Sequence, residues 1–200
     1  MRVLILVPII HTQQDMGSLL ERTQKEYVVR HGAEKWDAHL KSIGLVWKGI
    51  RQMIAALELP GASVRLYQDG LPLCGREEAV VREVAAQGSQ NHLILLDLMA
   101  QGAQIMGTED PDLLLQEYRL HQETGNDGPS HENPVQRHDL LAARDQYIAG
   151  RINATLKAGE VGLLFLGMAH AVEPLLDANI LVRHLLPSLR EAQEKVRCPA

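Results

Sequence analysis

Two histidines stand close behind short apolar runs at opposite ends of the sequence. His11 follows the run over residues 3–10, in PIIHTQQDMGS, and His170 follows the run over residues 161–166, in LLFLGMAH. Each run has the length of a buried strand in a parallel sheet. Because open α/β sheets bind ligands at the carboxyl ends of their strands, we expect the two imidazoles to meet at one edge of one sheet. The pattern indicates a functional site without naming a reaction.

Acidic residues follow two further expected strands. Glu109, in GTEDP, comes after a short strand over residues 104–106 and is either a metal ligand or general base, or an acid favoured by the dipole of the next helix. Asp69 follows a strand over residues 63–67, but Asp-Gly is a common turn dipeptide, so a turn is the favoured interpretation. Glu117, two helical turns beyond Glu109, is interpreted as a solvated or paired surface acid.

The segment behind the first strand offers two more candidates. Asp15 and Ser18 flank Gly17, where a helix is expected to begin. The free amides of that helix N-terminus can hold an anion at the same strand end. Alternatively, Asp15 or Ser18 simply caps the helix.

Arg144 and Asp145 lie next to each other on a long expected helix. Arg144 can bind a carboxylate or phosphate through two parallel hydrogen bonds, or can belong to a buried structural ion pair. Asp145 points about 100° away around the helix, so the two side chains need not act together.

Strands and helices alternate along the whole chain. This pattern predicts a three-layer α/β fold with a largely parallel central sheet, in a single domain over residues 1–200. The segment over 123–134, ETGNDGPSHENP, is rich in turn-forming residues and is expected to be a flexible surface loop. The strands are expected over 3–10, 63–67, 104–106, 161–166 and 180–183, and the helices over 17–30, 33–58, 76–86, 91–101, 111–121 and 135–158, with a short terminal helix.

Composition excludes several classes of protein. The net charge of −5 gives no reason to expect nucleic acid or a membrane surface as a partner, and no stretch approaches the ~20 apolar residues of a membrane span. Polar residues directly follow the first apolar run, so that run is expected to be a strand rather than a signal peptide. Cys74 and Cys198 are too few for a disulfide framework, which favours a reducing cytoplasmic setting. The oligomeric state stays open, a homo-oligomer included.

Well-known catalytic motifs are missing from the sequence. It has no GxxxxGK[ST] loop, no GxGxxG after the first strand, no HExxH and no GxSxG. The commonest nucleotide, dinucleotide and serine-hydrolase functions are therefore excluded, but a site of histidine and carboxylate is not.

The segment RDQYIAGRINATLKAGEVGLLFLGMAH resembles part of the erythromycin esterase, ChaN and TraB/Tiki superfamily. Gly167-Met168-Ala169-His170 matches the GxxH motif of the TraB/Tiki branch, whereas the first counterpart, Pro8-Ile9-Ile10-His11, has proline in place of glycine. The esterase branch has an Arg-Asp pair in the helix before the late strand, which Arg144-Asp145 resembles. The resemblance implies an α/β core with a histidine near each end of the chain. The superfamily includes metal-dependent peptidases, metal-independent esterases and haem-iron binding proteins.

The leading hypothesis is a hydrolase of ester or peptide bonds, with a small-molecule or peptide substrate. In one version His11, Glu109 and His170 hold a divalent metal ion that activates water. In a metal-free version a histidine acts as general base while Arg144 stabilises the oxyanion. The alternative is a binding or sensor protein that uses the same pocket for a ligand or metal without turnover. A carboxylate within reach of the histidines would favour the hydrolase.

Overall fold

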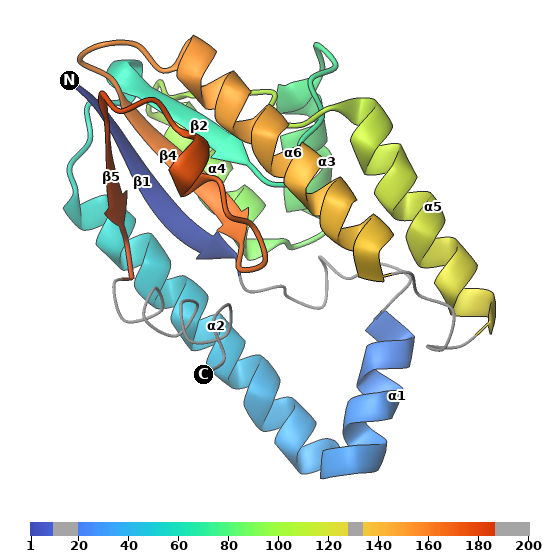
Figure 1. The fold of residues 1–200 in the computed structure, drawn as a ribbon. Coiled ribbons are helices and arrows are strands. Elements are labelled where there is room, and N and C mark those ends of the chain that lie inside the picture. The colour runs from blue at the N-terminus through green and yellow to red at the C-terminus, as the bar shows by residue number, and fades with distance from the viewer. Residues whose placement is uncertain (10–19, 128–133, 187–200) are drawn as a thin grey trace, which may run out of the picture.

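Five strands of the described residues form one sheet in which every neighbouring pair is parallel (Figure 1). The computed structural model describes residues 1–9, 20–127 and 134–186. The order across the sheet is β3-β2-β4-β1-β5, so β4 lies between β2 and β1, which both precede it in the chain. The strands are β1 (Arg2–Ile9), β2 (Val64–Gln68), β3 (Gln104–Met106), β4 (Val161–Gly167) and β5 (Ile180–His184).

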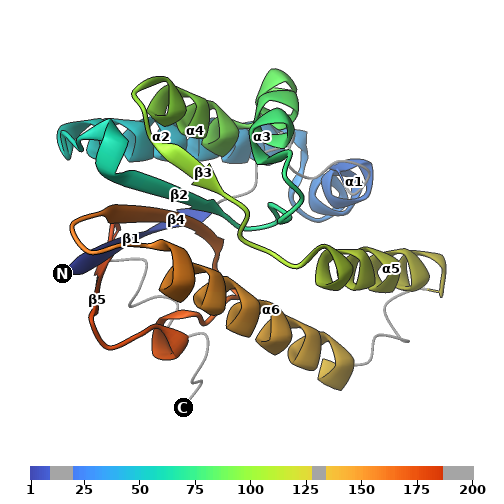
Figure 2. The same ribbon diagram turned by 90° about the horizontal axis from the view of Figure 1, so that it is seen from above.

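Helices cover both faces of the sheet, which confirms the expected three-layer α/β fold (Figure 2). Helices α2, α3 and α4 lie on one face, and α6 crosses the other, with α5 beside it. The helices are α1 (Leu20–His31), α2 (Ala33–Ala56), α3 (Glu77–Ala86), α4 (Gln90–Ala100), α5 (Pro111–Asp127) and α6 (Pro134–Thr155), with short 3₁₀ turns η3 (Gly61–Ser63) and η5 (Glu173–Leu175).

The alternating side chains of the central strands build two cores, one on each face. In β4, Leu163 and Phe165 pack in the cluster that contains Trp47 of α2. Leu164, between them, packs in the cluster that contains Ile148 of α6. Each of these side chains is fully buried or nearly so. Burial of each large apolar side chain contributes about 1.5–3 kcal/mol to stability. These two clusters therefore determine the register of the strands and the position of α6 on the sheet.

The connections that leave β2 and β4 run in opposite directions. The chain passes from β2 outward to β3, and from β4 across β1 to β5. Adjacent parallel strands with diverging connections create a crevice at their carboxyl ends, where ligands bind in open α/β folds. Gln68 at the end of β2 lies level with Phe165 of β4, so the loops behind the two strands start at the same edge.

One expected segment needs correction. The loop expected over 123–134 is wrong in its first part, because α5 continues as a helix to Asp127. Adding a residue to an existing helix costs little compared with nucleating one, and the Gln122 amide supports this turn through a hydrogen bond to the Tyr118 hydroxyl. Residues 128–133 lie outside the described part of the chain, as do the start of the first expected helix and the terminal helix.

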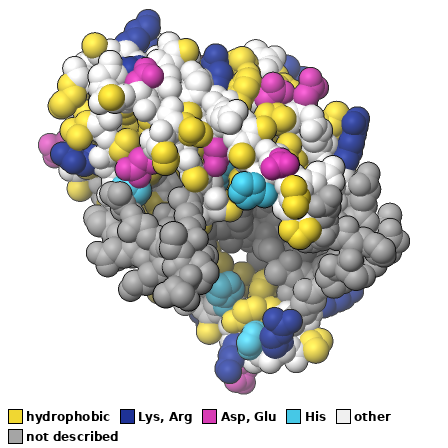
Figure 3. Space-filling view, viewed as in Figure 1, with side chains coloured by type: hydrophobic (Ala, Val, Ile, Leu, Met, Phe, Trp, Pro, Cys, Tyr) yellow, Lys and Arg dark blue, Asp and Glu magenta, His cyan; other side chains and the backbone are white. Residues whose placement is uncertain are grey.

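The apolar character of the helices and the charges at the surface are relevant to membrane and nucleic-acid partners. No helix in the described ranges combines the length and the apolar character needed to cross a membrane. On the face shown in Figure 3, acidic and basic side chains of the described residues are interspersed rather than gathered by sign.

Candidate metal centre

Three strand-end loops and one helix bring five polar side chains together at the carboxyl edge of the sheet. Asp69 directly follows β2, Glu109 follows β3, and His170 lies in the turn behind β4. Arg144 and Asp145 come from α6, which covers this face of the sheet. All of them are buried except Asp69, which keeps a small exposed fraction. So many buried ionisable groups are tolerated only when they are paired or bind a cation.

Asp145 fixes the orientation of the His170 ring. The His170 Nδ1 atom lies 2.6 Å from Asp145 Oδ1, and the other carboxylate oxygen accepts the Ala171 amide at 2.8 Å. An ionised carboxylate only accepts hydrogen bonds, so Nδ1 carries the proton. The second ring nitrogen, Nε2, then faces Asp69 Oδ2 at 3.5 Å. A buried imidazole with this partner arrangement is typical of a metal-binding histidine.

Arg144 ties the carboxylates of the site to one another. Its Nε and Nη2 atoms donate to the two oxygens of Glu109 at 2.8 and 2.6 Å. Nη2 also donates to Asp69 Oδ1 at 2.8 Å, and Nη1 donates to Glu117 of α5. Both interpretations of Arg144 from the sequence therefore describe this contact. It is a carboxylate bound through two parallel hydrogen bonds, and it is a buried ion pair.

Backbone amides complete the carboxylate contacts. The Gly167 amide donates to Asp69 Oδ2 at 2.9 Å, and the Gly70 amide donates to Glu109 Oε1 at 3.0 Å. Gly70 has a φ of 78°, which allows the chain to turn sharply behind Asp69. The Asp-Gly turn therefore exists, and it presents the aspartate to the site.

Burial and pairing shift the acid–base equilibria of the site in different directions. Burial alone would lower the pKa of His170, but the hydrogen bonds with Asp145 and Asp69 outweigh it and raise this pKa to about 9. Burial alone would raise the pKa of Asp69, yet its bond with His170 and the charge of Arg144 hold it well below the usual range. For Glu109, burial is the stronger influence, so its pKa is raised despite the pairing with Arg144.

Asp69, Glu109 and His170 have the donor atoms and spacing for a metal ion. One ligand atom from each lies within 4.8 Å of the others. Charge also favours a dication. Once a metal ion has displaced the second proton of His170, the described residues of the cluster hold three carboxylates, those of Asp69, Glu109 and Asp145, against one cation, Arg144. Two excess negative charges are then left to be balanced. The donor set, one imidazole and two carboxylates, is one that zinc or manganese accepts.

The residues expected from the sequence divide into two groups. Glu109, Arg144 and His170 lie together, and Asp69 and Asp145 join them. The ligand set expected from the sequence contained His11, which lies outside the described residues together with Asp15 and Ser18. Within the described part of the chain, Asp69 stands in the third ligand position.

Glu117 has a larger role than the sequence suggested. It is partly exposed and paired, as expected, but its partner is Arg144 in the site. A signal for this was present, because Glu117 shares a helix face with Leu113 and Leu120, both partly buried. An acid on an otherwise apolar stripe needs a partner.

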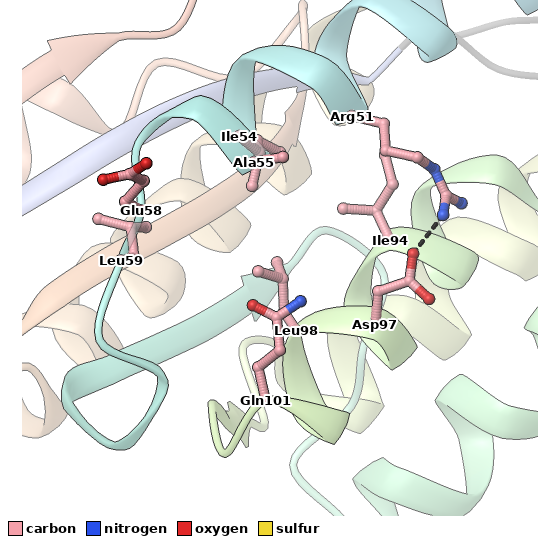
Figure 4. Close-up of a pocket in the computed structure, with 9 residues that line it drawn as sticks. All are labelled: Arg51, Ile54, Ala55, Glu58, Leu59, Ile94, Asp97, Leu98 and Gln101. Atoms are coloured by element: carbon pink, nitrogen blue, oxygen red, sulfur yellow. Dashed lines mark hydrogen bonds and ion pairs between the residues drawn. The ribbon is translucent and has the colours of Figure 1, made fainter.

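A separate cavity lies between α2 and α4, on the opposite face of the sheet (Figure 4). Ile54, Ile94 and Leu98 give it an apolar lining, and the Arg51–Asp97 ion pair spans its edge. Both charged side chains are well exposed, so the pair contributes at most about 1 kcal/mol. None of the five site residues lines this cavity.

Comparison with protein-family models, with curated proteins and with solved structures finds no match to this chain. The assignment of the site therefore rests on the geometry and chemistry of the residues described above.

Gly167 is expected to be essential for the close approach of Asp69 to the end of β4. A Cβ atom at this glycine would lie 2.8 Å from Asp69 Oδ2, against the contact that the Gly167 amide now makes. We expect Gly167→Ala to lower the free energy of unfolding by about 1–3 kcal/mol, the usual cost of overpacking. The matched control is Gly150→Ala in α6, where a Cβ meets nothing within 4 Å and helix propensity improves. Equal stabilities of the two variants in urea denaturation would contradict this interpretation.

Proposed function

We propose that the protein is a hydrolase of ester or peptide bonds in which Asp69, Glu109 and His170 bind a divalent metal ion. The observation that carries the proposal is the orientation of His170, whose Nδ1 is held by Asp145 while Nε2 faces the Asp69 carboxylate. The GxxH motif at Gly167–His170 and its likeness to the TraB/Tiki branch support the same function. A metal ion in such a site would lower the pKa of bound water and supply a nucleophile at neutral pH.

The residues around the ligands have definable parts in this function. Asp145 keeps a proton on Nδ1, so Nε2 is the nitrogen that would give up its proton and bind a metal. Arg144 holds Asp69 and Glu109 in place and favours their ionised forms. The carboxylate oxygens retain lone pairs beyond those used by Arg144 and the backbone amides.

The metal-dependent version is better supported than the metal-free one. In the metal-free version, Arg144 would stabilise an oxyanion, yet its Nε, Nη1 and Nη2 atoms already donate to three carboxylates. Serving a substrate would require breaking a buried ion pair, which is costly. The pairing also removes Glu109 as an unengaged general base.

The pairing of Glu109 with Arg144 favours a second candidate function, a protein that binds a metal or ligand without turnover. Both oxygens of Glu109 accept hydrogen bonds from Arg144, so this carboxylate is poorly placed to take a proton from water. The two candidates share the same metal ligands and differ only in turnover.

A substrate screen separates these functions. Protein without a histidine tag is treated with EDTA and assayed on ester and peptide panels before and after addition of Zn²⁺ or Mn²⁺. We expect metal-restored hydrolysis that falls at least about 100-fold in His170→Gln. The control is His184→Gln, which removes another histidine–carboxylate pair, with Glu173, whose members do not belong to the group of possible ligands. Metal binding without hydrolysis would establish the second candidate, and hydrolysis unaffected by EDTA and by His170→Gln would contradict the metal-dependent proposal.

We further propose a cytoplasmic location and a small-molecule or peptide substrate. The location is supported by sparse cysteine usage, with Cys74 a free thiol at the surface. The net charge of −5 and the interspersed surface charges of Figure 3 do not favour a polyanionic partner.

A further inference from the structure

A buried polar network lies directly behind the metal centre, on the opposite face of the sheet. Its central residue is Gln68, the last residue of β2, which is 2% exposed. The Gln68 side chain donates to the backbone carbonyl of Asp69 at 2.9 Å and accepts a hydrogen bond from the Asn91 amide at 3.1 Å. Burying two amide side chains is costly unless they are hydrogen-bonded, and the two bonds just described meet that requirement.

The start of α4 is arranged to hold Asn91 in this network. Ser89 occupies the N-cap position of α4, where a serine hydroxyl usually accepts a hydrogen bond from the helix backbone. Here it makes no such bond and instead donates to Asn91 Oδ1 and contacts His92 Nδ1. Ser89 and Asn91 are both almost fully buried. The helix thus gives up a side-chain cap to orient the amide that contacts Gln68.

The same network connects the loops that carry two metal ligands. The backbone amide of Gln68 donates to the Thr108 hydroxyl at 3.0 Å. The amides of Thr108 and Glu109 both donate to the carbonyl of Leu71, three residues beyond Gln68. The Asp69 loop and the Glu109 loop are therefore joined by hydrogen bonds on the side away from Arg144.

We propose that Gln68 and Asn91 are positioning residues that hold the Asp69 loop of the metal centre, to which the Glu109 loop is hydrogen-bonded through backbone amides. This inference rests on the proposed function for its consequence, metal affinity, although the positioning itself acts without a metal. The Gln68 side chain holds the Asp69 backbone carbonyl from the opposite face of the sheet, and the Asn91 amide holds the Gln68 side chain. The Nδ1 side of His170 is held separately, by Asp145 of α6.

The test replaces the two amides with apolar side chains of similar shape, in Gln68→Met/Asn91→Leu. Removing both partners of a buried hydrogen bond together leaves neither of them unsatisfied, and the Ser89 hydroxyl, which loses Asn91, keeps its contact with His92 Nδ1, so the fold should survive. The matched control is Tyr67→Phe, in the same strand, which loses the buried bond between the Tyr67 hydroxyl and Thr155 without touching the Asp69 loop. Should the double variant fail to fold, Asn91→Ser is used instead. It replaces the amide with a shorter hydroxyl that does not reach Gln68, with a smaller change in packing.

Two measurements read the result. Titration with Zn²⁺ or Mn²⁺ is expected to show affinity reduced about 10-fold or more in the double variant and unchanged in Tyr67→Phe. Hydrogen exchange of the Gly167 amide, which donates to Asp69 Oδ2, is expected to be about 10-fold faster in the metal-free double variant than in the control. If the wild-type chain binds neither metal, the proposed function fails while the exchange experiment still decides this inference. Unchanged exchange at Gly167 in the folded variant would overturn the positioning role.

Discussion

Replacing Arg144 with methionine is expected to lower the free energy of unfolding by about 3–5 kcal/mol at pH 7, the typical cost of breaking a buried ion pair. The reason is that the substitution leaves the Glu109 carboxylate buried without its ion-pair partner. This carboxylate is completely buried, and without Arg144 it keeps the hydrogen bond from the Gly70 amide but loses the cation that balances its charge. Part of the loss should appear as a further rise in the pKa of Glu109, because a lone buried carboxylate takes up a proton.

Chemical denaturation of the wild type and three variants tests this prediction. Arg144→Met/Glu109→Gln should recover part of the lost stability, since the buried charge is then removed with its partner. The matched control is Arg65→Met, because Arg65 also pairs with a carboxylate, Glu160, through two hydrogen bonds, but with both side chains partly in solvent. We expect that control to lose less than Arg144→Met, because the Glu160 carboxylate keeps some contact with water and its hydrogen bond from the Lys157 amide. A loss for Arg144→Met no larger than for Arg65→Met would contradict the account of the site as a buried ion-pair network.

The stability of the metal-free protein is expected to fall as the pH rises from about 6.5 to 9. In the folded protein the pKa of His170 is raised to about 9 from 6.5, because the bonds to Asp145 and Asp69 outweigh its burial. A raised pKa means that the folded state binds the proton more tightly. Its stabilising effect is therefore complete below pH 6.5 and is lost as the pH passes through 9. The difference between these pKa values corresponds to about 3 kcal/mol.

The comparison with His170→Gln isolates this effect. In EDTA, the difference in unfolding free energy between wild type and His170→Gln should shrink by about 3 kcal/mol between pH 6 and pH 9.5. Parallel pH curves for wild type and His170→Gln would show that the imidazolium is not held between the two aspartates.

The positions of most elements could be predicted because local patterns determine them. The apolar run at the end of the chain predicted β4, and the short strand over residues 104–106 was predicted with its observed bounds. Strand-end placement also directed attention to Glu109 and His170. These inferences need only the period of a strand and the rule that parallel strands end at one edge.

The contacts within the site could not be predicted, because they depend on how α6 lies against the sheet. Asp145 and Arg144 point in different directions around the helix, yet both reach the site because their partners come from different strand ends. Asp69 was first interpreted as a turn residue, and nothing in Asp-Gly itself distinguishes a turn that presents a ligand from one that does not. His11 stays a prediction.

Metal titration by calorimetry tests the central claim most directly. At pH 7.5 in buffers of different ionisation enthalpy, we expect one Zn²⁺ or Mn²⁺ per chain, with release of about one proton as the metal displaces it from His170. Asp69→Asn and His170→Gln should each weaken binding at least about 100-fold, whereas Asp97→Asn, at an exposed ion pair with Arg51, should not. Absence of stoichiometric binding, or binding that survives both ligand substitutions, would contradict the assignment of Asp69, Glu109 and His170 as a metal centre.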